Sequence, residues 1–249
     1  QSVLRLFNRS GFAYEGNGFV YDFELKYNIP AITARVSLNN GTEFEGSFLV
    51  DTGSKSELLI SSPTVISYNL INHVGDNYVL RTKLGSSQKR VKIMYGRIAG
   101  FNFAGEEFTN VPVALNSTTE GVLSFENING IVGNKILSRF NITFDYSNEK
   151  IYLEPNRSLN NTFKTNAAGM SIYFKNGNPY VKDVVDRSPA SRAGLKNGDQ
   201  LISINGELVE NIDSKTLRNS FYKQGQQLDI VIKRNGRFKY TEVKLQELI

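Results

Sequence analysis

The stretch Phe48-Leu49-Val50-Asp51-Thr52-Gly53-Ser54 decides how the first half of this chain folds. Its three apolar residues are typical of a buried strand. A carboxylate at the exit of such a strand is costly unless nearby groups satisfy it. The following residues can do so, because Gly53 lets the backbone come close and Thr52 and Ser54 carry hydroxyl donors. The local alternative is a strand followed by an Asx-type turn, since Asp, Gly and Ser are common in turns.

A second stretch later in the chain supports a more specific interpretation of the first one. It reads Asn129-Gly130-Ile131-Val132-Gly133-Asn134, and it is followed by Phe140-Asn141-Ile142-Thr143-Phe144-Asp145-Tyr146. Together the stretches resemble the active-site strand and loop of retropepsin-like aspartic proteases and the apolar-apolar-Gly segment beside it. The resemblance covers residues 28–155 and implies a closed β-barrel of mainly β structure. It implies Asp51 as the catalytic residue, supported by Thr52, Gly53, Ser54 and Gly133.

The chemistry of that family requires two aspartates, because an ionised carboxylate activates water while a protonated one polarises the scissile carbonyl. This chain carries Asp-Thr-Gly-Ser once, and a second Asp-Thr-Gly or Asp-Ser-Gly does not occur. The resemblance therefore implies a homodimer in which each chain contributes Asp51. It further implies that Thr52 bonds across the dimer, that Ser54 bonds the outer carboxylate oxygen, and that a flap closes over the substrate. Lys83–Lys92 is the candidate flap, with an ordinary exposed hairpin as the alternative.

The chain divides by composition into four parts. Residues 1–27 alternate around a turn and predict one or two lead-in strands. Residues 28–155 form the first domain, in which Ser62-Pro63 starts a helix that is expected to run to Val74. Residues 156–166 are polar and predict a linker. Residues 167–249 form a second domain.

The second domain carries the run from Ser188 to Gly206, Ser-Pro-Ala-Ser-Arg-Ala-Gly-Leu-Lys-Asn-Gly-Asp-Gln-Leu-Ile-Ser-Ile-Asn-Gly. This run and the strands before it resemble a PDZ domain of the bacterial, protease-associated type. The resemblance implies a small β-sandwich with two short helices, which binds a peptide as an added strand. Amides of Ala168, Gly169 and Met170 are expected to hold the carboxylate of a protein C-terminus. The expected groove residues are Gly169, Met170, Ser171, Ile172, Leu217 and Phe221. The alternative is a module that only packs on the protease or supports its dimer.

Composition excludes several other classes of function. The chain has no cysteine, so thiolate chemistry is absent, and its single histidine, His73, lacks a Ser and Asp pattern around it. Asp145, Asp199 and Asp213 each fit a turn or a helix cap, so no metal and no cofactor is expected. The net charge of +5 is spread without a basic stripe, which argues against nucleic acid. No apolar run approaches the ~18 residues that a membrane span needs. A start at Gln1 favours an exported protein, periplasmic, secreted or cell-surface.

The sequence therefore predicts an aspartic endopeptidase with a polypeptide substrate. The alternative is a non-catalytic peptide-binding protein with an inactive protease-like barrel.

Overall fold

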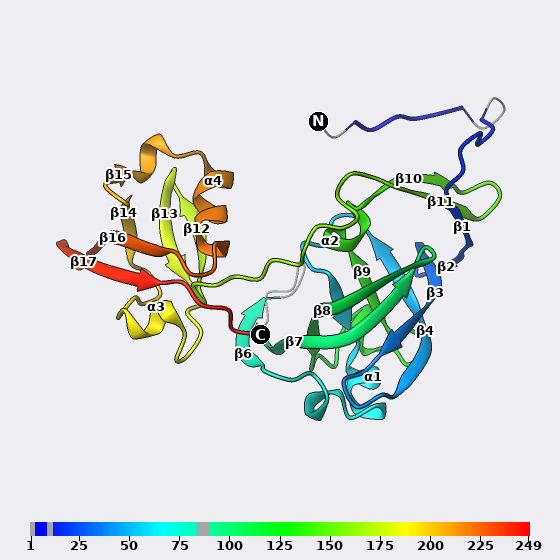
Figure 1. The fold of residues 1–249 in the computed structure, drawn as a ribbon, viewed down its shortest axis with the longest axis horizontal. Helices are drawn as coiled ribbons and strands as arrows, with labels where there is room; N and C mark the ends of the chain where they lie inside the picture. Colours follow the sequence, from blue (N-terminus) through cyan, green and yellow to red (C-terminus); the bar gives the residue numbers. More distant parts are fainter. Residues whose placement is uncertain (1–2, 9–11, 84–89) are drawn as a thin grey trace.

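The structure, a computed structural model, describes residues 3–8, 12–83 and 90–249. Over these residues the protein is mainly β, as expected, with strands in three sheets and only short helices between them. Figure 1 shows two units side by side, an N-terminal unit coloured blue to green and a C-terminal unit coloured yellow to red. We use these names for residues 19–155 and 167–249. Within the described ranges, no helix is long and apolar enough to cross a membrane.

The largest sheet belongs to the N-terminal unit. Its order is β2-β3-β4-β9-β5-β8-β7-β6, and β3 also pairs with β7, so the sheet closes into a ring with β2 and β6 attached outside. The alternating apolar residues of each strand thereby face a common interior. Its strands are β2 (Glu24–Lys26), β3 (Ile29–Ser37), β4 (Glu43–Asp51), β5 (Leu58–Ile60), β6 (Tyr78–Lys83), β7 (Arg90–Phe103), β8 (Glu106–Asn116) and β9 (Gly130–Gly133).

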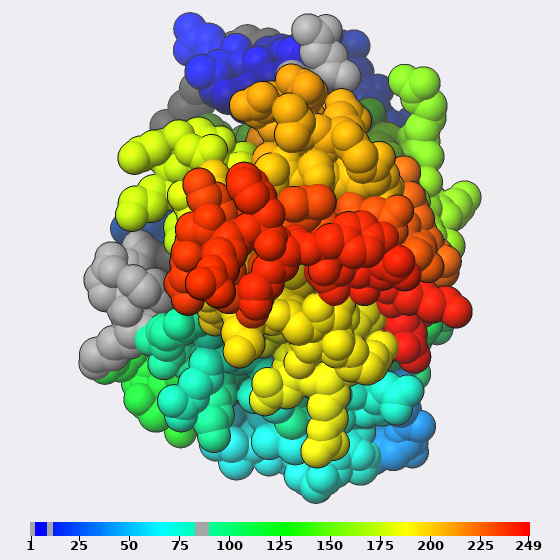
Figure 2. Space-filling model, turned by 90° about the vertical axis from the view of Figure 1, so that its left-hand side faces the viewer, coloured from blue at the N-terminus to red at the C-terminus, as the bar shows by residue number. Residues whose placement is uncertain are grey.

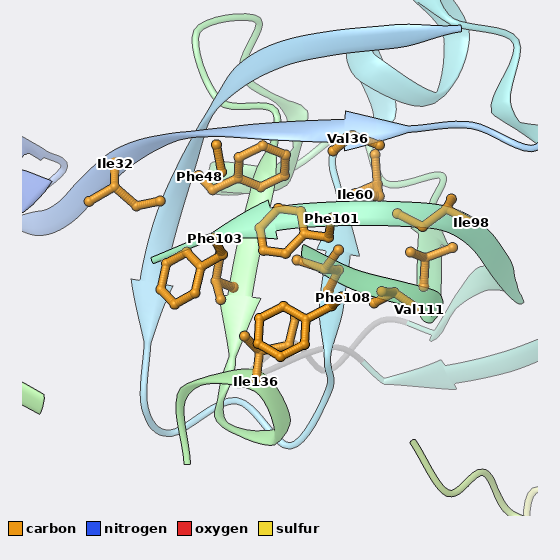
Figure 3. Close-up of a cluster of buried hydrophobic side chains, with 14 of the residues drawn as sticks. Ile32, Val36, Phe48, Ile60, Ile98, Phe101, Phe103, Phe108, Val111 and Ile136 are labelled. Carbon is orange, nitrogen blue, oxygen red and sulfur yellow. The ribbon is translucent and has the colours of Figure 1, made fainter. Parts of the chain in front are cut away.

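Aromatic side chains fill the interior of the ring. Figure 3 shows Phe48, Phe101 and Phe103 pointing inward from β4 and β7, with Phe108 and Ile136 below them. Phe48 and Phe101 are 0% exposed, and their rings meet edge to face at 5.6 Å. Such a core holds the exit of β4 in a fixed position, because close-packed interiors yield little to displacement.

Short helices and turns connect the strands at points that the sequence partly marks. Ser61 caps α1 by accepting a hydrogen bond from the Thr64 N–H. The helix expected through Val74 ends at Ser67, because Asn69 adopts φ +48° and a separate 3-10 turn follows. The helical segments of this unit are α1 (Ser62–Ser67), η1 (Leu70–Asn72), η2 (Val122–Ser124) and α2 (Asn134–Leu137).

The described lead-in residues form two strands, of which β2 belongs to the largest sheet and β1 joins a separate three-stranded sheet of order β1-β11-β10. β1 (Phe19–Asp22) pairs antiparallel with β11 (Lys150–Pro155), and β11 pairs with β10 (Phe140–Asp145). Lys150 Nζ lies 2.6 Å from Asp22 Oδ1 at the end of this pairing.

The C-terminal unit holds one sheet of order β12-β13-β14-β16-β17, with β15 paired to β14. A two-layered sandwich was expected, but β14 pairs with both β13 and β16 and so joins all these strands edge to edge. Its strands are β12 (Ser171–Lys175), β13 (Asn178–Lys182), β14 (Gln200–Ile204), β15 (Glu207–Leu208), β16 (Gln227–Arg234) and β17 (Arg237–Lys244). Its helical segments are α3 (Pro189–Arg192), η3 (Val209–Asn211), α4 (Ser214–Asn219) and η4 (Ser220–Tyr222). Figure 2 looks at this unit from the left of Figure 1, with its yellow-to-red residues in front.

Candidate active site

The candidate catalytic carboxylate lies at the end of a buried strand. Residues 48–50 of β4 are at most 6% exposed, and Asp51 is the last residue of that strand. Its Oδ1 accepts hydrogen bonds from the backbone N–H groups of Gly53 (2.8 Å) and Ser54 (3.2 Å). No described residue offers Oδ2 a hydrogen-bond donor. The loop therefore anchors one carboxylate oxygen and leaves the other open to a partner.

The hydroxyl of Ser54 does not make the contact that the family resemblance implies. Ser54 Oγ lies 2.7 Å from Ser56 Oγ, while the backbone N–H of Ser54 bonds the inner oxygen of Asp51. The tight turn after β4 brings the amide over Oδ1 and directs the hydroxyl along the loop. Thr52 is exposed at the tip of this turn, so its bond across a dimer stays a prediction.

Gly133 lies beside Asp51 in the sheet. β4 and β9 run parallel, and Asp51 is the register partner of Gly133. The Gly133 N–H donates to Glu57 O (2.8 Å), and the next amide, that of Asn134, donates to Ser54 O (2.9 Å). A Cβ at position 133 would lie 2.2 Å from Ser56 O. The absence of a side chain therefore allows β9 to hold the loop after Asp51 by backbone hydrogen bonds.

An ion pair behind the loop, with its acid buried and its lysine exposed, was not predicted from the sequence. The Glu57 side chain is 8% exposed and accepts a hydrogen bond from Lys135 Nζ at 2.9 Å. Lys135 also lies 5.9 Å from the ring centroid of Tyr222 in the C-terminal unit. The signal in the sequence was an acid directly before the apolar residues of β5, which is seldom buried without a partner.

The remaining chemistry-bearing residues do not assemble another centre. His73 Nε2 lies 3.4 Å from Asn40 Nδ2, and neither a serine nor a carboxylate is among its hydrogen-bond partners in the described structure. Asp213 caps α4, and Asp145 accepts from the Ser147 and Asn148 amides, as expected for a cap and a turn. Over the described ranges, no cluster of three or more His, Cys, Asp or Glu residues could hold a metal ion.

The groove residues of the C-terminal unit divide into two sets. Residues 169–172 lead into β12, an edge strand that faces α4. Leu217 and Phe221, also expected to line the groove, are at most 2% exposed and belong to the hydrophobic core of this unit. The amides of Ala168 and Gly169, which were expected to hold a ligand carboxylate, donate to Asn166 Oδ1 instead.

Polar side chains tie the two units together. Arg90 in β7 donates to Asp183, whose side chain is 4% exposed, and Lys182 Nζ lies 3.2 Å from the same carboxylate. Arg97, also in β7, bonds Glu247 at 2.6 Å and the carbonyl of Ile249 at 3.1 Å. Of the expected flap Lys83–Lys92, residues 84–89 lie outside the described residues.

Two stacked tyrosines mark the same junction. The rings of Tyr78 and Tyr95 lie 5.1 Å apart on β6 and β7. Burial, with Asp183 and Glu57 nearby, raises the pKa of Tyr95 to about 12. Burial likewise raises the pKa of Tyr78. Both hydroxyl groups therefore stay neutral where the C-terminal unit meets the base of the β6–β7 pair.

Comparisons with known proteins bear mainly on the C-terminal unit. The family model "PDZ domain" matches residues 180–234. The serine protease Do-like HtrA of Bacillus subtilis (strain 168) is 34% identical over 71 residues, which is 27% of this chain and 15% of that protein's length. So short a share of that protein does not bring its activity to this chain.

Solved structures resemble this chain only at low sequence identity and low TM-score. An EIAV protease complexed with an inhibitor is 16% identical, covering 44% of this chain and 86% of its own, with a TM-score of 0.30. An HtrA-type protease AlgW with a decapeptide is 13% identical, covering 91% of this chain and 63% of its own, with a TM-score of 0.32. Neither score is high enough to support an inference about the site. The family match thus identifies one part of the molecule: the C-terminal unit contains a PDZ domain.

Proposed function

We propose that this protein is an aspartic endopeptidase whose water-activating dyad is formed by Asp51 from two copies of the chain. The observation that carries the proposal is the asymmetry of the Asp51 carboxylate. Its Oδ1 is held by two loop amides, while its Oδ2 has no donor among the described residues. A carboxylate fixed on one side and open on the other is suited to share a proton with a second carboxylate.

The surroundings of Asp51 support the same role. The loop after Asp51 is fastened by the amides of Gly133 and Asn134, so the carboxylate can hold its orientation without help from a ligand. Preorganised groups of this kind favour catalysis, since they need not reorganise during the reaction. Two carboxylates about 3 Å apart cannot both ionise easily, so one keeps a proton and can polarise the scissile carbonyl.

The PDZ domain has a separate task in this proposal. An exposed edge strand of a PDZ domain binds an extended peptide by main-chain hydrogen bonds. Contacts from Arg90 and Arg97 hold that domain beside β7. A segment captured there would be tethered near the protease unit, which raises its effective concentration at Asp51.

Serine-protease chemistry is a poorer account of this chain. It requires a serine, a histidine and a carboxylate in hydrogen-bond succession. The ring of the single histidine, His73, contacts Asn40 and neither a serine nor a carboxylate among the described residues. The HtrA resemblance therefore contributes a recruitment domain to the proposal and no catalytic residues.

The first experiment replaces the carboxylate and keeps its shape. Asp51→Asn is expected to abolish cleavage of a fluorescein-labelled unfolded protein, measured from acidic to neutral pH. Asp76→Asn makes the same substitution at an exposed aspartate and is expected to cleave like wild type. Cleavage by Asp51→Asn at the wild-type rate would overturn Asp51 as the catalytic residue, and absence of cleavage by wild type would favour a non-catalytic peptide-binding protein.

A mixing experiment tests the dyad itself. Wild-type and Asp51→Asn chains are co-refolded in equal amounts at constant total concentration. If each site needs two intact carboxylates, random pairing leaves roughly one quarter of the wild-type activity, whereas a one-chain site leaves roughly one half. An equal mixture with Asp76→Asn should keep full activity. Half activity with Asp51→Asn would show that one chain is sufficient.

A further inference from the structure

The outer edge of β12 carries backbone groups that face away from its sheet. Ile172 is the register partner of Val181 on β13. The Val181 N–H donates to Asp199 O (2.8 Å), and its carbonyl accepts from the Gly198 N–H (2.9 Å), so both groups point to the far side. Antiparallel pairs alternate between bonded and non-bonded residues, so the N–H and C=O of Ile172 point outward. An incoming strand would pair with Ile172.

A side chain of this protein already occupies one of those positions. Arg218, in the last turn of α4, donates from Nη1 to the carbonyl of Ile172 at 2.8 Å. Its guanidinium carbon lies 5.2 Å from the ring centroid of Phe174, two residues further along β12. None of the ion pairs found in the described residues involves Arg218. The guanidinium is therefore bonded to the carbonyl that a peptide N–H would use.

A second side chain bonds the backbone just before β12, where the end of a peptide would be held. Asn166 Oδ1 accepts hydrogen bonds from the N–H groups of Ala168 (3.1 Å) and Gly169 (2.9 Å). Its Nδ2 donates to the carbonyl of Met170 at 2.7 Å. The carboxamide thus presents an acceptor and a donor to the groups that would receive the end of a peptide. The N–H groups of Ala168 and Gly169 therefore already have an acceptor and do not require a terminal carboxylate.

From these contacts, and resting on the proposed peptide recruitment, we propose that Arg218 determines the specificity of the groove. The groove selects an internal extended segment that carries Asp or Glu opposite Ile172, in preference to a free C-terminus. Arg218 holds the empty groove through Ile172 O, and the acidic side chain of the ligand takes its place as the partner of the guanidinium.

Charge accounts for the preference. A bound strand donates its own N–H to Ile172 O and releases Arg218 beside the ring of Phe174. A carboxylate can then accept two parallel hydrogen bonds from the guanidinium, which a neutral amide cannot match. Lys175 on β12 and Lys215 on α4 are exposed and carry the same sign of charge. The acid on this helix, Asp213, is engaged as its N-cap at the opposite end.

The test measures binding to the full chain carrying Asp51→Asn, so that no probe is cleaved. The probes are fluorescein-labelled ten-residue peptides of Ala, Val, Leu and Tyr with one Glu at a varied position. Each has a Gln counterpart, and each is made as a free acid and as a C-terminal amide. Affinities are measured by fluorescence anisotropy. The best Glu peptide is expected to bind about threefold or more tightly than its Gln counterpart, as for a partly exposed, well-oriented ion pair.

Two variants isolate the residue. Arg218→Gln should bring the Glu-to-Gln ratio to about one, and the change in ratio measures the coupling between the two charges. Lys215→Gln removes the same charge from the same helix without touching Ile172, and it should keep most of the preference. An unchanged ratio in Arg218→Gln would overturn the assignment.

The two forms of the probe test the closed end. Amidation is expected to alter affinity by less than about twofold, because Asn166 already occupies the amides of Ala168 and Gly169. A requirement for the free acid would overturn the preference for internal segments. Absence of binding by every probe would overturn both the inference and peptide recruitment. The Asp51 cleavage and mixing results are obtained without these peptides and would still decide the catalytic proposal.

Discussion

The contact between β9 and the loop after Asp51 yields a sharp test of the site's architecture. In Gly133→Ala, the new methyl group would lie 2.2 Å from Ser56 O and 2.9 Å from the carbon of the same carbonyl. Real Cβ contacts essentially never fall below 3.0 Å, so the carbonyl must retreat. It cannot do so alone, because the amides of Gly133, Asn134 and Lys135 all donate to carbonyls of residues 54–57.

The cost follows from overpacking and from the weakened bonds. Forcing a methyl group into a packed site costs about 1–3 kcal/mol. Weakening backbone bonds that are each worth about 0.5–1.5 kcal/mol adds a comparable amount. We expect Gly133→Ala to lose about 3 kcal/mol of unfolding free energy, or ~6–12 °C in the Tm of the N-terminal unit. Cleavage should fall with it, since the moved loop carries the amides that hold Asp51.

Gly100→Ala is the matched control. Gly100 is also a strand glycine of the ring-like sheet, but a Cβ there would meet Ser37 and Phe108 O at 3.5 and 3.6 Å, an ordinary contact. Its Tm should stay near wild type. Scanning calorimetry can separate the transition of the N-terminal unit from that of the PDZ domain. If Gly133→Ala melts within about 2 °C of Gly100→Ala, the loop after Asp51 can move to accept the methyl group, and the predicted loss of stability is refuted.

Two further predictions concern groups outside the loop. Asp199, whose side chain is 2% exposed, accepts two hydrogen bonds from Arg234, so Asp199→Asn should cost about 3–5 kcal/mol in urea unfolding. Asp186→Asn, at an exposed aspartate of the same unit, should be close to neutral. The folded-state pKa of Tyr95, about 12, lies above the usual tyrosine value of 10.0, so its contribution to stability is complete below pH 10 and lost between pH 10 and about 12. Urea unfolding at rising pH should show that fall, and Tyr95→Phe should lessen it; an unchanged fall would rule out Tyr95 as a source.

Local features of the chain were readable from the sequence because they depend on neighbours. The apolar residues before Asp51 predict β4, and the small polar residues after it predict the loop whose amides bond the carboxylate. Ser188 precedes Pro189, a pattern typical of a helix start, and its side chain accepts from the Ser191 N–H. Asp213 was expected as a possible cap, and it accepts from the amides of Lys215 and Thr216. Such short-range hydrogen bonds follow from residue type and spacing.

Contacts between residues far apart in the sequence could not be predicted from local residue type and spacing. Arg234 pairs with Asp199, 35 residues away, and nothing in the sequence around either residue indicates this contact. The Glu57–Lys135 pair and the Arg90–Asp183 contact between the units depend on tertiary packing that no local pattern reports. The bond from Arg218 to Ile172 O likewise depends on how α4 lies against β12.

The pairing of β1 with β11 has a consequence for the order in which the molecule is made. Phe19 lies opposite Leu153, so residues 20–152 must be synthesised before the partner of this strand leaves the ribosome. Closing so long a loop is slow, because its entropy cost comes before any contact repays it. Phe19 and Val20, each 43% exposed even in the finished fold, stay unpaired throughout that interval. During synthesis, this short apolar strand therefore stays exposed to other chains until β11 is available to pair with it.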